Sequence, residues 1–182
     1  MLDAVGRARL TAAVKTLQVI VLAMVVGALG FLIVGMLIEV ERAQSSADRG
    51  LSPILSYMAA AFGPVALVAS FVAPAALLSV GTARVAAGRP LPGADRSDQP
   101  RDDIGQLIQL HAQITIIGCA CLEGAALLAG LAYMIEKQII ALVVAAALIT
   151  FLAARVPTIT KLSEWIDERS DKLERIRSAA VK

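Results

Sequence analysis

Four long stretches of the sequence contain almost no charged side chains, and they constrain the fold more than any motif. The first lies between Lys15 and Glu39, and the longest lies between Arg49 and Arg84. The third contains a single charged residue, Glu123, and the fourth contains none. A helix of about 20 apolar residues crosses the hydrocarbon core of a bilayer. The four stretches therefore predict a membrane protein with four transmembrane helices.

The composition agrees with this prediction. Hydrophobic residues make up 58% of the 182 residues and charged residues only 18%, whereas soluble domains are about 45–50% apolar. The predicted fold is all-α, with a transmembrane bundle of two hairpins over residues 1–156, a cytoplasmic loop at 83–107 and an amphipathic helix over 157–182. The expected spans are residues 16–39, 54–80, 108–135 and 138–154.

The distribution of basic residues predicts the orientation. Lys and Arg gather before the first span, in the 83–107 loop and in the C-terminal tail, whereas they are few and balanced by acidic residues in the two other connections. Cytoplasmic segments of membrane proteins carry the excess of Lys and Arg. We therefore expect both termini in the cytoplasm, which agrees with an even number of spans.

Glu123 is the residue that a simple bundle explains least. Counted from the ends of its span at about 1.5 Å per residue, it lies near the middle of the membrane. An ionised carboxylate there costs about 2.5–3.5 kcal/mol on insertion scales. Three hypotheses remain open, which are a neutral carboxyl hydrogen bonded within the chain, a group that handles protons or cations, and a contact with a partner.

The same depth count selects the other candidates for an ion or proton site. Cys119 precedes Glu123 by one turn, and Ser70 and Thr150 lie about one turn nearer the cytoplasm in their own spans. No Lys or Arg is expected at the depth of the carboxylate. A salt bridge within the chain is therefore not predicted.

Two prolines are predicted to kink the second span, Pro64 and Pro74. Because a proline has no N–H, Pro74 leaves the carbonyl of Ser70 without its helical donor. A protonated carboxyl needs an acceptor, and a free carbonyl in the membrane needs a donor. We predict that Glu123 and the Ser70 carbonyl meet, directly or through a water.

Small residues spaced four apart predict where the helices pack. Such pairs let helix backbones approach closely in lipid. They occur in the first and third spans, which we expect to form the central packing pair. The residues concerned are Ala23, Gly27, Ala120, Gly124 and Gly130, the last of which pairs with Ala126.

The sequence predicts neither catalysis nor a bound cofactor or metal. Cys119 and Cys121 are two residues apart and point in different directions on a helix, so we expect neither a disulfide nor a zinc site. His111 is the only histidine, and haem held between helices would need a second axial ligand. The arginines of the 83–107 loop stand among aspartates, which argues against a nucleic-acid partner. No small-molecule substrate is identifiable.

The tail "VPTITKLSEWIDERSDKLERIRSAAVK" predicts a helix with one apolar face. Pro157 ends the fourth span, and Thr158 is a candidate N-cap for the tail helix. Either the apolar face lies on the cytoplasmic leaflet, with Trp165 at the depth of the headgroups, or it packs on another helix. The interpretation that we favour is the helix on the membrane surface. Its apolar face contains Leu162, Trp165, Ile166, Leu173 and Ile176.

The motifs "LEGAA" (122–126) and "RVPT" (155–158) resemble the second half of small four-span bacterial membrane proteins. This resemblance implies a fold and a place in the bacterial cytoplasmic membrane, and it implies no activity. The buried carboxylate is more loosely similar to that of the proteolipid hairpins of rotary ATPases. Glu123 differs from that pattern because it lies on the first helix of its hairpin rather than the second.

The function expected from the sequence is therefore that of a non-enzymatic packing, scaffold or accessory subunit, in which Glu123 is a neutral clamp. The alternative is a component of a proton or cation pathway in which Glu123 changes its protonation state. The expected partners are the lipid bilayer and other membrane subunits or a second copy of the chain.

Overall fold

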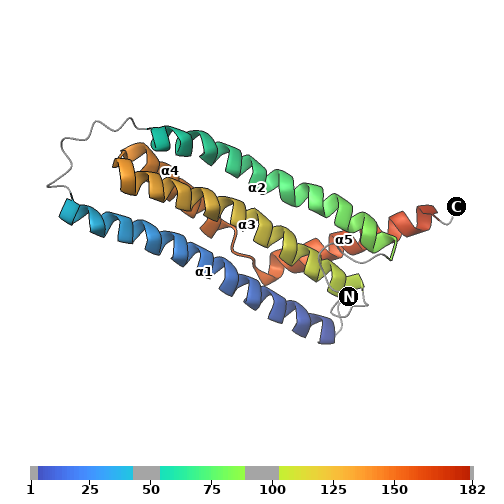
Figure 1. Ribbon diagram of the computed structural model, residues 1–182. Helices are drawn as coiled ribbons and strands as arrows, with labels where there is room; N and C mark the ends of the chain where they lie inside the picture. The colour runs from blue at the N-terminus through green and yellow to red at the C-terminus, as the bar shows by residue number, and fades with distance from the viewer. Residues whose placement is uncertain (1–3, 43–53, 89–102, 181–182) are drawn as a thin grey trace. The chain divides into compact units, whose positions relative to one another are not determined.

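The chain is all-helical in the computed structural model, which describes residues 4–42, 54–88 and 103–180. This confirms the all-α part of the predicted fold. The described residues form five helices in the order drawn in Figure 1, which are α1 (Ala4–Arg42), α2 (Ile54–Ala86), α3 (Asp103–Glu136), α4 (Ile139–Ala154) and α5 (Ile159–Ala180).

Three of the helices are long and apolar enough to cross a membrane. The candidate spans in the described residues are Ala8–Ile38, Ile54–Ala86 and Asp103–Glu136. Helix α4 has only 16 residues, and it reaches the required length together with α5 if the two are counted as one bent span. The described chain therefore has three or four candidate spans, as expected of a membrane protein.

The helices are longer than the uncharged stretches from which they were predicted. Helix α2 continues to Ala86 and α3 begins at Asp103, so both ends of the predicted 83–107 loop are helical. Helix hydrogen bonds join backbone groups, so polar and charged residues can continue these helices beyond the apolar stretch. The remainder of the predicted loop, 89–102, lies outside the described residues.

The chain divides into two compact units, and each long helix contributes to both. Unit 1 contains Met1–Val19, Val72–Ile117 and Pro157–Lys182, and unit 2 contains Ile20–Phe71 and Gly118–Val156. Each unit has its own cluster of buried apolar side chains.

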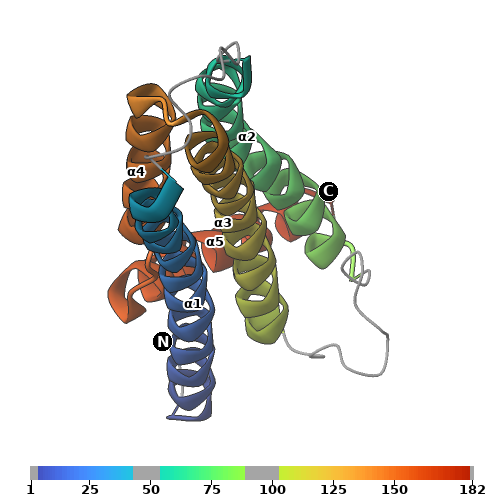
Figure 2. The same ribbon diagram turned by 60° about the vertical axis from the view of Figure 1, so that its left-hand side comes forward.

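The core of unit 2 is rich in alanine, which keeps its helices close together. In this unit α3 lies between α1 and α2 (Figure 2), and α3 and α4 supply most of the buried residues. A Cβ on Gly63 of α2 would lie only 2.9 Å from Cγ1 of Val144 on α4. A Cβ on Gly130 of α3 would lie 3.1 Å from a ring carbon of Phe31 on α1. Both glycines are therefore positions of close helix approach.

The core of unit 1 is built from larger side chains. Its buried members come from α1, α2, α3 and α5, and they are Leu10, Val14, Val85, Leu107, Leu110, Leu162, Ile166 and Leu173. Gly81 of α2 provides space for Leu110, because a Cβ at this position would overlap the leucine side chain. Unit 1 is thus a leucine and isoleucine core, in contrast to the alanine core of unit 2.

A tight turn joins α3 to α4 within unit 2. Lys137 has a positive φ of 61°, and its N–H donates to the carbonyl of Tyr133 at 2.9 Å. A residue in the left-handed region commonly ends an α-helix in this way. The turn fixes the position of Glu136, the last residue of α3.

Candidate functional site

Glu123 lies on α3 in unit 2 and is partly buried. A Cβ built on Gly27 of α1 would lie 4.0 Å from Oε1 of Glu123, so the carboxylate approaches the backbone of α1 where it has no side chain. Across residues 4–42, 54–88 and 103–180, no hydrogen bond or ion pair reaches this carboxylate. The charge that the sequence singled out is thus without a partner in the described part of the chain.

Four small residues of α1 and α3 near Glu123 are exposed, and we call them the open face around Glu123; they are Ala23, Gly27, Ala120 and Gly124. Gly124 is exposed, and no atom lies within 4 Å of a Cβ built on it. The other predicted packing residues of this region are also exposed, namely Ala23, Gly27 and Ala120. Gly130 differs from them, because it is buried against Phe31. The helices therefore pack closely at Gly130 and leave the face around Gly124 uncovered.

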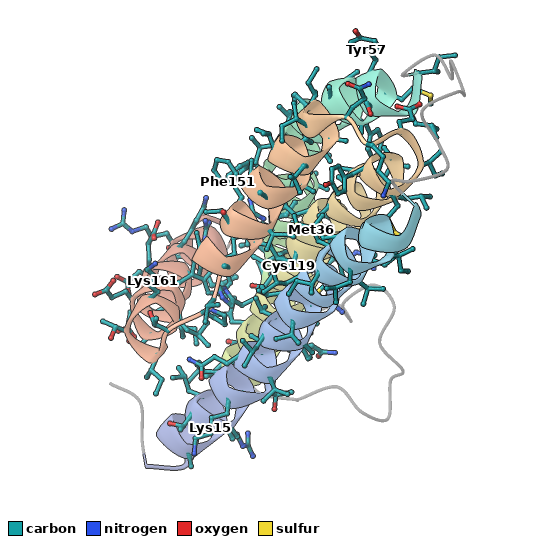
Figure 3. The ribbon with its side chains drawn as sticks, turned by 90° about the vertical axis from the view of Figure 1, so that its left-hand side faces the viewer. Lys15, Met36, Tyr57, Cys119, Phe151 and Lys161 are labelled. Atoms are coloured by element: carbon teal, nitrogen blue, oxygen red, sulfur yellow. The ribbon has the colours of Figure 1, made fainter. Side chains whose placement is uncertain are left out.

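Cys119 lies one turn before Glu123 and is fully buried. Figure 3 shows it among the helices of unit 2, whereas Tyr57 and Phe151 point away from the helices. Glu123 and Arg155 both lie within electrostatic range of the Cys119 thiol. Unit 2 therefore brings a carboxylate, a thiol and a guanidinium into one region.

Arg155 donates a hydrogen bond to the carbonyl of Ser70, which lacks its helical donor because Pro74 has no N–H. Its Nη1 donates to the carbonyl oxygen of Ser70 at 2.8 Å, and its Nη2 donates to the Ser70 hydroxyl at 3.1 Å. The guanidinium also lies over the ring of Phe71, with Cζ 4.3 Å from the ring centre. Ser70 is fully buried, so this contact satisfies a polar group that would otherwise have no donor.

This contact corrects the predicted partner of Glu123. The Ser70 carbonyl binds the guanidinium of Arg155, and Glu123 lies beside Gly27 of α1 instead. The physical reason is that an arginine at the end of a short helix can extend its long side chain to a buried acceptor. It also presents several donors at once and always carries its charge.

The remaining residues of the predicted ion site are placed elsewhere. Thr150 is exposed, and its hydroxyl donates to the carbonyl of Ala146 at 2.8 Å within its own helix. Helix α2 continues through Pro64 and Pro74 without an assigned break. Among the predicted candidates, the structure therefore gathers Glu123 and Cys119, and it assigns Ser70 to Arg155.

Glu136 binds the start of α2. Its Oε1 accepts from the N–H of Leu55 at 2.6 Å, and its Oε2 accepts from the N–H of Ser56 at 2.7 Å. The first N–H groups of a helix have no partner within the helix, and an acidic group there also interacts favourably with the helix dipole. Helix α3 thus caps α2 through its last side chain.

Sequence reasoning missed the roles of Glu136 and Arg155. The signal was present, because both are charged residues that flank the uncharged helix α4, within three residues of its ends. The N-terminus of α2 and the residue four before Pro74 were identifiable as groups in need of a partner. The pairing between them depends on α4 lying along α2, which the sequence does not specify.

Helix α5 packs three of its large apolar side chains on protein. Leu162, Ile166 and Leu173 are buried in unit 1 against side chains of α1, α2 and α3. Trp165 is partly buried, and its ring meets that of His111 edge to face at 4.9 Å. The favoured interpretation of a lipid-facing apolar side therefore gives way to packing on other helices, because these leucine and isoleucine side chains are already covered. Ile176 lies in α5, but its side chain is outside the described residues.

The described residues contain no group of three or more His, Cys, Asp or Glu side chains that could hold a metal ion. Cys119 and Cys121 are both free thiols. The chain matches no protein-family model, no curated protein and no solved structure. The functional argument therefore rests on the residues themselves.

Proposed function

We propose that this protein is a non-enzymatic, multi-pass membrane protein that acts as an accessory subunit, and that the open face around Glu123 binds a helix of another membrane protein. The observation that carries the proposal is the carboxylate itself. It lies in the middle of an apolar helix, and no described residue binds it. An ionisable side chain in a membrane span is costly to insert into the bilayer, so a residue of this kind usually marks a functional site.

The surroundings of the carboxylate support a helix as the ligand. Gly27 of α1, which Glu123 approaches, and Gly124 of α3, which follows Glu123, are both exposed, and small residues allow another backbone to approach closely. The partner helix would carry Lys, Arg or a neutral hydrogen-bond donor at the depth of the carboxylate. Such a donor satisfies Glu123 and makes the contact specific.

We propose the following topology for this function. Helix α4 is the fourth span, both termini lie in the cytoplasm, and the membrane is the bacterial cytoplasmic membrane. The support is the excess of Lys and Arg in the N-terminal segment, the middle loop and the tail. Helix α5 is an amphipathic cytoplasmic helix that uses its apolar side for packing and leaves its charged side in water.

The test is site-specific photocrosslinking in the native membrane. A photoreactive amino acid replaces Gly124, and the matched control replaces Val143, which is 60% exposed on α4. We expect a discrete protein adduct from position 124 and none from position 143. Glu123→Ala should reduce the adduct about tenfold, as the loss of a charge-assisted hydrogen bond requires. Equal adducts from both positions, or an adduct that is insensitive to Glu123→Ala, would contradict the proposal.

Ion handling is the competing function, and a separate assay distinguishes it. The purified chain in liposomes should not increase proton flux above that of empty liposomes if Glu123 serves a partner helix. Flux that the chain supports and that Glu123→Gln abolishes would replace the docking proposal with a proton pathway. Gln retains the size and hydrogen bonding of the side chain and removes only its ability to release a proton.

A further inference from the structure

Unit 1 contains a cavity between α2 and α5 that has a distinct chemical character. Its volume is about 390 Å³, within the usual range of ligand sites. One wall is the last three turns of α2, and the other carries two basic residues of α5. The lining residues are Ala75, Leu78, Ser79, Thr82, Ala83, Ala86, Arg169 and Lys172. We call this space the α2–α5 cavity.

The two basic residues of the cavity have unused donors. Nε of Arg169 is buried and has no hydrogen-bond acceptor in the described structure. Its Cζ lies 5.8 Å from the centre of the Trp165 ring, which holds the guanidinium on one side. Lys172 is exposed at the cavity, and no ion pair to it is seen among the described residues. The cavity therefore presents two cations that lack an anion.

The opposite wall supplies apolar surface rather than further charge. The Thr82 hydroxyl donates to the carbonyl of Leu78 at 2.7 Å, and that of Ser79 donates to the carbonyl of Ala76 at 2.8 Å. Because both hydroxyls donate to their own helix, the donors for an anion come from α5. The α2 wall suits a hydrocarbon chain, since its other lining residues are alanine and leucine.

The cavity lies along α2 where the sequence predicts the membrane boundary. It lines the end of α2 where Arg84 terminates the longest uncharged stretch of the sequence. Anionic headgroups are found at this depth, and basic cavities beside transmembrane helices bind them. A ligand with a phosphate head and an apolar tail would meet the cations of α5 and the apolar wall of α2 together.

The two sides of α5 also differ in charge. A second cavity of unit 1, about 820 Å³ in volume, is lined by Asp167, Asp171 and Glu174 of α5. These carboxylates repel an anion from that side of the helix. Of the two cavities, the one lined by Arg169 and Lys172 is the one that would attract an anion.

We propose that the α2–α5 cavity binds an anionic phospholipid, with its phosphate on Arg169 and Lys172 and its acyl chain along α2. The site is independent of the Glu123 face, because its residues belong to unit 1 and Glu123 belongs to unit 2. The planar guanidinium is suited to bind two phosphate oxygens, and the lysine adds a point charge.

The chain carries its own probe for this site. Trp165 is the only tryptophan and contacts Arg169. The full-length protein is placed in nanodiscs of phosphatidylcholine, and brominated phosphatidylglycerol or brominated phosphatidylcholine is added as the quencher at equal mole fraction. We expect stronger quenching by phosphatidylglycerol. Quenching is expressed relative to the unquenched emission of each variant, because a change at Arg169 alters the tryptophan itself.

Variants locate the effect in the cavity. The double variant Arg169→Gln with Lys172→Gln should lose about 25-fold of its preference for phosphatidylglycerol, at about fivefold for each cation. The matched control is Lys161→Gln with Arg175→Gln, which removes the same charge from exposed positions of α5 outside the cavity. This control should retain most of the preference. An equal loss in both double variants would overturn the site.

Two further experiments distinguish a lipid phosphate from a soluble phosphate as the ligand. Inorganic phosphate or glycerol phosphate, added at the concentration of the lipid headgroup, should not displace the brominated phosphatidylglycerol, because neither has an acyl chain. Displacement by either anion would show a site for soluble phosphate and would overturn the lipid assignment. Equal quenching by the two brominated lipids in the unmodified protein would also overturn it.

Discussion

Two charged residues that flank α4 are bound within the chain, whereas the charged residue in the middle of α3 is not. Glu136 just before α4 and Arg155 just after it are both bound to the backbone of α2, at its first N–H groups and at the Ser70 carbonyl. Glu123 in the middle of α3 lies beside Gly27 and is bound by no described residue. All of these groups belong to unit 2, so the difference is one of position along the helices.

The difference follows from what a helix leaves unsatisfied. The start of a helix offers free N–H groups, and the carbonyl four residues before a proline lacks its usual donor. An acidic side chain can accept from the free N–H groups, and a guanidinium can donate to the free carbonyl. The middle of a regular helix offers neither, so the carboxylate of Glu123 needs a partner from a side chain or from another molecule. Charge at the helix ends is therefore structural, and charge in the middle of α3 is available for function.

The largest effect is expected at Arg155. Arg155→Met removes two hydrogen bonds from a charged donor and leaves the buried Ser70 carbonyl without a donor, which should cost about 3 kcal/mol of unfolding free energy. The measurement is equilibrium unfolding in mixed micelles, followed by helix content. Arg155→Lys retains a charge but fewer donors and should lose less. A methionine variant as stable as the unmodified chain would remove the structural role assigned to the guanidinium.

The next effect distinguishes two helix glycines that differ in how closely other atoms approach them. Gly63→Ala places a Cβ 2.9 Å from Val144 and should cost about 2 kcal/mol through overpacking. Gly124→Ala meets no atom within 4 Å and should leave the unfolding free energy unchanged or slightly raised. The same unfolding titration compares them. A comparable loss at both positions would mean that the Gly124 face is used within the chain.

A smaller loss is expected at Glu136. Glu136→Ala removes the acceptor of two N–H groups at the start of α2 and should lower the melting temperature by a few degrees. Glu136→Gln retains one carbonyl oxygen and should fall between the alanine variant and the unmodified chain. Circular dichroism during heating in detergent measures all three. If glutamine and alanine behave alike and neither lowers the melting temperature, the cap does not stabilise the fold.

The sequence was sufficient to predict the helices, but it was not sufficient to predict which helices contact one another. Uncharged stretches between residues such as Arg49 and Arg84 predicted α1, α2 and α3 because burial in a membrane acts on a whole segment at once. The need of the Ser70 carbonyl for a donor was also predictable from Pro74. Which donor reaches it was not, because no feature of the sequence indicated a role for Arg155 in the packing of the helices. Its contact depends on the packing of α4, which is encoded in many weak alanine contacts.

The tail illustrates the same limit. The spacing of Leu162, Ile166 and Leu173 predicted one apolar side for α5. Lipid and protein are equally apolar surfaces for leucine, so periodicity cannot distinguish them. The structure buries these residues in unit 1. The proposed lipid contact of α5 therefore lies at Arg169 and Lys172, where charge provides a distinction that hydrophobicity does not.

The most direct measurement is the melting temperature of the purified Glu123→Ala variant beside that of Glu136→Ala. Glu123→Ala removes a carboxylate that no described residue binds, so its melting temperature should equal or exceed that of the unmodified chain. Glu136→Ala should be lower, as above. If Glu123→Ala lowers the melting temperature as much as Glu136→Ala, the Glu123 carboxylate is a structural clamp within the chain, and it is not available to a partner.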